Sequence, residues 1–177
     1  MDARVQPPPS NPAAADGFPI TLQLNGSEHT THVQPWVTLL DLLREEAHLT
    51  GTKKGCDHGQ CGACTVLLDG KRVNSCLQLA VAVDGSTVQT IEGLGTDAQG
   101  MRELDPLQQA FMDHDAFQCG YCTPGQICSA RGLLSEGKAR TREEVRELMS
   151  GNLCRCGAYT NITDAVMSVL SSEGAAK

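Results

Sequence analysis

Three cysteines lie close together in a glycine-rich stretch, at Cys56, Cys61 and Cys64. Their C-x4-C-x2-C spacing is that of the loop that binds a plant-type [2Fe–2S] cluster through thiolate sulfurs. Glycines at positions 55, 59 and 62 fit such a loop, since its backbone takes unusual φ angles and brings N–H groups close to the sulfurs. A structural zinc site is the alternative, but zinc ligands usually come as two close pairs. The spacing therefore favours a redox-active iron–sulfur site.

The fourth thiolate that this cluster needs is expected at Cys76, which follows Cys64 after eleven intervening residues. Those residues predict a β-hairpin, with strands at 65–68 and 72–75 and a primed turn at Asp69-Gly70. Cys76 ends the returning strand, so the hairpin brings it towards Cys64, where the outgoing strand begins. The first predicted set of ligands is Cys56, Cys61, Cys64 and Cys76.

A second cysteine set lies in the C-terminal half, as a C-x2-C pair at Cys119 and Cys122 and a C-x-C pair at Cys154 and Cys156. The pairs are 31 residues apart, and four thiolates suit either zinc or an iron–sulfur cluster. The first site favours an iron–sulfur cluster here as well, because two redox centres side by side can pass electrons from one to the other. Both pairs are expected at helix boundaries, where N-terminal amides stabilise thiolate charge.

Three other residues near these cysteines are not expected to be ligands. Cys128 falls inside a predicted helix and is interpreted as a small, buried apolar side chain. His58 is expected to point to solvent, because four cysteines already complete the first site. Arg155, between two predicted ligands, is expected either to balance cluster charge or to lie at an interface.

The composition argues against several other classes of protein. The chain has 177 residues, with 40% apolar but only 3% aromatic residues, and domains this small and poor in aromatics commonly need metals or disulfides for stability. Nine clustered cysteines, an odd number, favour metal thiolates in a reducing compartment over a disulfide framework. A net charge of −7 without a basic block argues against nucleic-acid binding, and no apolar run approaches the length of a membrane span.

The first half of the chain is predicted to form a β-grasp ferredoxin domain over residues 18–93, after a flexible tail at 1–17. Alternating apolar residues from Ile20 to Leu24 predict a strand, and Asn25-Gly26 predicts the turn of a hairpin that returns through Val33. Beyond it, Trp36 is expected in the core, Thr38 is expected to cap a helix reaching Ala47, and a last strand is expected at 87–91. One helix would then pack across a small mixed sheet.

The second half is predicted to be helical. Residues 94–103 read as a glycine-rich connector, 104–172 as a four-helix bundle, and 173–177 as a tail, which gives an α+β fold overall. The helices are expected to begin at Asp105-Pro106, Thr123-Pro124, Thr141 (a capping box with Glu144) and about Asn161, and the first three to end near His114, Gly137 and Gly151.

Three stretches of this sequence resemble one known family. They are Gly55-Cys-Asp-His-Gly-Gln-Cys-Gly-Ala-Cys-Thr65, Gln118-Cys-Gly-Tyr-Cys-Thr-Pro-Gly125 and Gly151-Asn-Leu-Cys-Arg-Cys-Gly-Ala-Tyr159. They resemble the iron–sulfur subunit of molybdenum hydroxylases, the xanthine oxidase family. The resemblance spans about residues 18–172 and fills all eight ligand positions. It looks closest to the small subunit of bacterial three-subunit aldehyde oxidoreductases.

The resemblance implies a path for electrons through three subunits. Substrate is oxidised at a molybdopterin cofactor in a large subunit, and electrons pass through two [2Fe–2S] clusters to FAD in a third subunit. In bacteria the molybdopterin is commonly the cytosine dinucleotide form. It also implies that Gln118 and the Cys156 region touch the pterin, and that Cys119, Cys122, Cys154 and Cys156 hold the nearer cluster. The first four cysteines would then hold the cluster near FAD. Relatives often carry a twin-arginine leader, which residues 1–17 lack, so the cytoplasm is expected unless the printed N-terminus is incomplete.

The residues themselves contain no acid–base pair, nucleophile or phosphate-binding loop that would activate a substrate. The leading hypothesis is therefore an electron-transfer subunit of a molybdenum-dependent aldehyde dehydrogenase. Purine, nitrogen heterocycle and carbon monoxide oxidation use a similar subunit in sister families, and the substrate stays open. A free-standing two-cluster ferredoxin and a zinc-stapled adaptor without redox function are the competing hypotheses.

Overall fold

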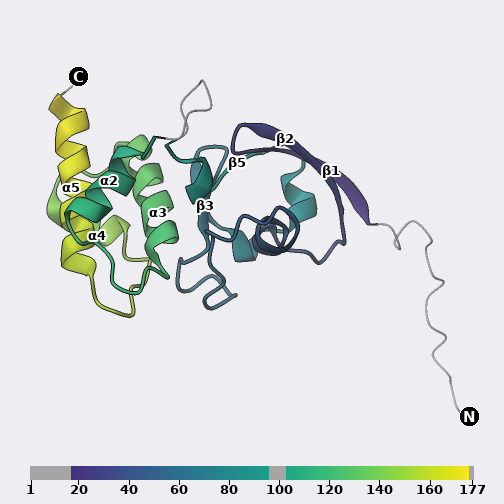
Figure 1. The fold of residues 1–177 in the computed structure, drawn as a ribbon, viewed down its shortest axis with the longest axis horizontal. Helices are drawn as coiled ribbons and strands as arrows, with labels where there is room; N and C mark the ends of the chain where they lie inside the picture. The colour runs from purple at the N-terminus through teal and green to yellow at the C-terminus, as the bar shows by residue number, and fades with distance from the viewer. Residues whose placement is uncertain (1–16, 96–102, 176–177) are drawn as a thin grey trace, which may run out of the picture.

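The computed structural model describes residues 17–95 and 103–175 of the chain. Figure 1 shows two regions side by side, one built on a β-sheet from the N-terminal half and one built of helices from the C-terminal half. The predicted α+β fold is confirmed. Residues 1–16 of the predicted tail and residues 96–102 of the predicted connector lie outside the described residues.

The sheet of the first region has five strands in the order β2-β1-β5-β3-β4. These are β1 (Phe18–Leu24), β2 (Ser27–Val33), β3 (Thr65–Leu68), β4 (Lys71–Asn74) and β5 (Thr87–Gln89). β1 pairs with β5 in parallel, whereas the two hairpins and the β3–β5 pair are antiparallel. The sheet is therefore mixed, as predicted.

Both predicted hairpin turns are present. Asn25 and Gly26 have φ angles of 52° and 82°, and Asp69 and Gly70 have φ angles of 48° and 76°. Two consecutive positive φ values are the signature of a type I′ turn, whose twist matches that of the flanking strands. The second turn sets a register in which Thr65 pairs with Asn74. This pairing brings Cys76, two residues after Asn74, back to the cysteine loop.

One short helical segment packs across the sheet. It starts as α1 (Leu39–Asp41) and widens at once into the π-helix η2 (Leu42–Glu46), where a single regular helix was expected. Thr38 caps it, because its hydroxyl accepts the N–H of Asp41 at 3.1 Å. Leu39 and Leu43 are buried with Leu22 in the sheet's core.

Two expectations for this region were wrong in detail. The side chain of Trp36 is 72% exposed, because it lies in a turn closed by the Val37 N–H on the Gln34 carbonyl, and Val37 packs on the core instead. The last strand ends at Gln89, before the 3₁₀ helix η5 (Ile91–Gly93). The N–H of Thr90 donates to the side-chain oxygen of Asn25 at 2.9 Å and not to the backbone of a neighbouring strand.

The second region contains four α-helices within the described residues. They are α2 (Pro106–Asp113), α3 (Thr123–Glu136), α4 (Arg142–Leu148) and α5 (Tyr159–Ala175). The first region contains two further 3₁₀ helices, η3 (Ser75–Leu77) and η4 (Ala80–Val83). The capping box predicted at Thr141 starts α4, and the predicted N-cap Asp105 starts α2, where Gln108 completes a capping box that was not predicted. At α3 the cap position is Cys122, and the hydroxyl of Thr123 finds no hydrogen-bond partner among the described residues.

The helices enclose a core of their own and also pack on the sheet. Phe111, Leu107 and Leu133 are almost completely buried in that core, and α3 contacts both β3 and β4. Figure 1 shows α3 as the helix nearest the sheet region. No helix in the described ranges is long and apolar enough to cross a membrane.

Candidate metal-binding sites

The loop before β3 folds around the thiol of Cys56. Its Sγ accepts the backbone N–H groups of Gln60 at 3.2 Å, Cys61 at 3.4 Å and His58 at 3.5 Å. The N–H of His58, and those of Cys61 and Gln60 after it, lower the pKa of Cys56 to about 6 against the opposing effect of burial. Backbone donors aimed at a sulfur are what an anionic iron–sulfur centre requires.

Cys64 and Cys76 form the buried side of the same set. The hairpin brings them together. The hydroxyl of Ser75, next to Cys76, donates to the Cys64 carbonyl at 2.8 Å, and both cysteines lie in one buried cluster with Leu40. Burial, and then the neighbouring Cys64 thiol, raise the pKa of Cys76 to about 12. A thiol in such a place becomes an anion only beside a metal that supplies positive charge.

The second cysteine set repeats this arrangement between the helices. Cys122 is the N-cap of α3, whereas Cys154 and Cys156 lie between α4 and α5. Burial, and then the Cys154 thiol, raise the pKa of Cys122 to about 12. Cys119 is exposed, and the N–H of Tyr121, followed by the Cys156 thiol, lowers its pKa. Each set thus contains one thiol whose pKa is raised, Cys76 or Cys122, and one whose pKa is lowered, Cys56 or Cys119.

The structure brings together the four members of each predicted set in pairs. Cys56 contacts Cys61, Cys64 contacts Cys76, Cys119 contacts Cys156 and Cys122 contacts Cys154. Within the described ranges, no three Cys, His, Asp or Glu side chains converge tightly enough to hold a single metal ion. Each set offers four cysteine thiols, which is the donor set of a [2Fe–2S] cluster.

The residues beside the cysteines behave largely as expected. His58 is exposed, and its Nε2 lies 3.1 Å from the Gln60 side-chain oxygen. Cys128 is 1% exposed, inside α3. Arg155 is exposed. Gln118 donates from Nε2 to the carbonyl of Cys156 at 3.5 Å, so these two predicted pterin contacts lie together at the exposed edge of the second set.

A cavity of about 680 Å³ separates the two cysteine sets. Its lining combines thiols of both sets with aromatic and apolar side chains: Cys56, Cys61, Cys119, Cys122 and Cys154, together with Ala63, Tyr121, Leu153 and Tyr159. Beside it the backbones of the two loops touch, because the Leu153 N–H donates to the Cys61 carbonyl at 2.9 Å.

Sequence reasoning missed the residues that join the two loops. Asn152 is 7% exposed and donates to the carbonyls of Gly62 at 2.9 Å and Gly125 at 3.2 Å. Each of these three residues is within three positions of a predicted ligand. The glycines carried a signal, since glycine between ligands indicates close backbone approach, but nothing in the sequence says which backbone approaches.

The cysteine sets coincide with two known sequence families. Residues 22–90 match the family described as 2Fe-2S iron-sulfur cluster binding domain. Residues 90–167 match the family described as [2Fe-2S] binding domain.

Whole-chain comparisons agree with these matches. The aldehyde oxidoreductase iron–sulfur-binding subunit PaoA of Escherichia coli O157:H7 is 51% identical over 89% of this chain and 74% of its own length. The nicotine 6-hydroxylase small subunit of Paenarthrobacter nicotinovorans is 47% identical over 89% of this chain and 93% of its own.

Solved structures with the same fold are also enzymes or parts of enzymes. Quinoline 2-oxidoreductase from Pseudomonas putida 86 superposes with a TM-score of 0.82 at 45% identity, over 90% of this chain and 96% of that one. Aldehyde oxidoreductase from Desulfovibrio desulfuricans ATCC 27774 gives a TM-score of 0.81 at 43% identity, over 90% of this chain but only 17% of a much longer one.

Proposed function

The chain belongs to the iron–sulfur subunits of the molybdenum hydroxylases, and we propose on that premise that it passes electrons from a molybdopterin centre to FAD. The molybdopterin would lie in a large partner subunit and the FAD in another. The observation that carries the proposal is the pair of four-thiol sets whose loops are hydrogen-bonded to each other, Leu153 to Cys61.

The eight ligands are assigned to two clusters. We assign Cys56, Cys61, Cys64 and Cys76 to one [2Fe–2S] cluster, and Cys119, Cys122, Cys154 and Cys156 to the other. When bound, such a cluster takes up and releases one electron at a time. The chain's own contribution is to stabilise charge: the N–H groups around Cys56 and the Ala158 N–H on Cys154 Sγ at 3.4 Å offset the negative charge of the thiolates.

The order of the cofactors is the one that the family implies, and the exposed residues of the second set offer a place for the first partner. Cys119, Cys156 and Gln118 are exposed on the helical region, so we place the molybdopterin subunit against them, with Gln118 and Cys156 near the pterin. We place the FAD subunit against the loop that carries Cys56. In the Desulfovibrio enzyme the matching region is a part of one long chain, which supports work within a larger assembly over work as a free ferredoxin.

The proposed substrate is an aldehyde, oxidised to a carboxylic acid in the large subunit. The support is the similarity to the aldehyde oxidoreductase subunit, at 51% identity. A nitrogen heterocycle is the second candidate, because the nicotine and quinoline enzymes are nearly as similar. We also propose the cytosine dinucleotide form of the pterin and cluster loading in the cytoplasm, since the nine cysteines, all unpaired, require reducing conditions.

The experiment is to tag the chain in its native host, purify it gently and analyse what accompanies it. Two larger subunits, molybdenum, FAD and about four irons per tagged chain would support the proposal, and aldehydes and heterocycles could then be compared as substrates. The same iron on a lone chain would identify a ferredoxin instead. Zinc without acid-labile sulfide would overturn both readings.

A further inference from the structure

Three cysteine-bearing segments meet at the side chain of Asn152. The two hydrogens of its Nδ2 are shared among three acceptors, the carbonyl of Gly62 at 2.9 Å, Oγ1 of Thr65 at 3.1 Å and the carbonyl of Gly125 at 3.2 Å. The side chain is buried, so these bonds form away from competing water and are directional.

Each partner of Asn152 belongs to a segment with assigned cluster ligands. Gly62 lies between Cys61 and Cys64, Gly125 follows Cys122, and Asn152 itself precedes Cys154. The segments approach to backbone contact: a Cβ on Gly125 would lie 2.4 Å from the Gly62 carbonyl oxygen, and a Cβ on Gly62 would lie 2.6 Å from that of Gly151. A small displacement of one loop is therefore felt by the others.

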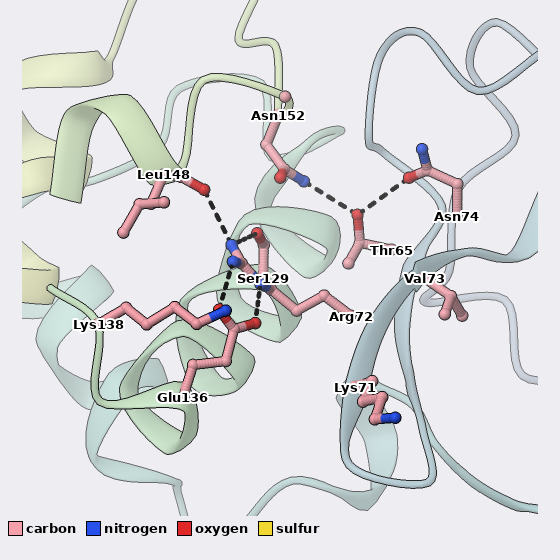
Figure 2. A pocket seen from close by; sticks show the side chains of 11 residues that line it. Thr65, Lys71, Arg72, Val73, Asn74, Ser129, Glu136, Lys138, Leu148 and Asn152 are labelled. Carbon is pink, nitrogen blue, oxygen red and sulfur yellow. Dashed lines mark hydrogen bonds and ion pairs between the residues drawn. The ribbon is translucent and has the colours of Figure 1, made fainter. Parts of the chain in front are cut away.

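Neighbouring polar groups hold Asn152 in this orientation. The buried side chain of Gln126 donates from Nε2 to the Asn152 carbonyl at 2.8 Å. On the other side, the Thr65 hydroxyl donates to the Gly62 carbonyl at 2.7 Å, and the Asn74 Oδ1 lies 3.4 Å away as a second, longer acceptor. Figure 2 shows Asn152, Thr65 and Asn74 in a row from the helical region to the hairpin.

Arg72 forms a second clamp across the same interface. From β4 it makes paired bonds to the Glu136 carboxylate of α3, at 2.8 and 3.0 Å, and donates to the carbonyl of Leu148 at 2.9 Å. Its stem lies over Gly132, where a Cβ would come within 2.3 Å of it. Between the two clamps lies a cavity of about 590 Å³ (Figure 2).

We propose that Asn152 is a positioning residue that sets the separation and orientation of the two clusters, with Arg72 as the outer clamp of the same interface. The inference rests on the proposed function, because it needs both clusters. Apolar contacts alone would allow the sheet region to slide on the helices, since they carry no direction. The three bonds of Asn152 tie one loop of each cluster to a fixed register, and so fix a distance on which both magnetic coupling and electron tunnelling depend steeply.

The test compares three variants of the full chain in the assembled enzyme. Asn152→Leu removes the inner bonds at similar size, and Arg72→Met removes the outer clamp. Asn161→Leu is the matched control, because Asn161 donates from Nδ2 to the Asp115 carbonyl within the helical region only. Each sample is reduced with dithionite, assayed for iron, and examined by EPR for the magnetic interaction between the two reduced clusters.

We expect all three variants to contain the full amount of iron. The splitting of the EPR signals that the magnetic interaction produces should be lost or narrowed in Asn152→Leu, narrowed less in Arg72→Met, and unchanged in Asn161→Leu. A merely structural role would lower thermal stability without changing the splitting. Wild-type splitting in Asn152→Leu at full iron would overturn the inference. If Asn152→Leu fails to load iron, the EPR splitting of Arg72→Met at full iron is the test, and a wild-type splitting in that variant would overturn the inference. A wild-type enzyme without iron would instead overturn the proposed function.

Discussion

The backbone N–H of Leu153 donates a 2.9 Å hydrogen bond to the carbonyl of Cys61. Leu153 immediately precedes Cys154, so one backbone contact joins a cysteine of the first set to a cysteine of the second. No side chain takes part in this bond, and mutation cannot remove it directly. Its geometry depends on the side chains that hold the two loops, and these can be tested.

Replacing one cysteine of each set should remove one cluster at a time. We expect Cys119→Ser and Cys56→Ser each to abolish a different one of two [2Fe–2S] EPR signals and to halve the iron, because a missing thiolate leaves one iron under-coordinated. Turnover of the enzyme with an external acceptor should stop in the Cys119 variant. Cys128→Ala is the control, since Cys128 is buried in α3 and should leave both signals intact. Full activity in Cys119→Ser would contradict the relay.

The packing of the two loops predicts a strong effect at Gly125. A Cβ there would lie 2.4 Å from the Gly62 carbonyl oxygen, a backbone atom that cannot move without shifting the cysteine loop. We expect Gly125→Ala to lower the free energy of unfolding by about 1–3 kcal/mol, measured by urea denaturation. Gly151→Ala is the matched control, because a Cβ at Gly151 meets no atom within 4 Å. Equal stability of the two variants would show that the loops are not in contact.

The Glu136–Arg72 ion pair predicts a dependence of stability on pH. The Arg72 guanidinium lowers the pKa of Glu136 below its ordinary 4.5, against the effect of burial. Because the folded pKa lies below the unfolded one, the carboxylate stabilises the fold above about pH 4.5, and this contribution is lost as pH falls through the folded pKa.

We therefore expect Glu136→Gln to be less stable than the wild type near neutral pH, by about 0.5–1 kcal/mol for a partly exposed pair. The difference should vanish in acid, as followed by urea unfolding across the pH range. Glu28→Gln, on the exposed strand β2, is the control that should show no such pattern. A difference that persists in acid would assign the effect to packing of the side chain.

The exposure of Trp36 predicts that its removal costs little. With 72% of its side chain exposed, Trp36→Ser should change the free energy of unfolding by less than about 0.5 kcal/mol. Leu22→Ala, at a completely buried position of β1, should cost about 2–5 kcal/mol. Thermal unfolding of the two variants, side by side, distinguishes them. A large loss at Trp36 would restore the core position that the sequence suggested.

Much of the fold was predictable because local chemistry determines it. Asn25-Gly26 and Asp69-Gly70 favour type I′ turns whatever surrounds them, and the capping boxes at Asp105 and Thr141 are complete within four residues. The cysteine spacing predicted the two sets in the same way, because a loop around a cluster is short and glycine-rich.

The remaining features depend on contacts between distant segments. Trp36 is exposed because Val37 fills the core beside it, a choice that hydrophobicity alone does not make. The π-helical turn after Asp41 carries no pattern that separates it from an α-helix. Asn152 looked like an ordinary loop residue, because its partner Gly62 is 90 positions earlier and only the folded chain brings them together.

That separation has a consequence for biosynthesis. The loop with Cys56, Cys61 and Cys64 leaves the ribosome 90 residues before Asn152, the residue that anchors it. At bacterial and eukaryotic elongation rates this interval lasts roughly 5–20 s. The sheet region is synthesised before the helical region that packs on it, so the hydrogen bond from Asn152 to Gly62 in the first cysteine loop can form only after the second half of the chain has been made.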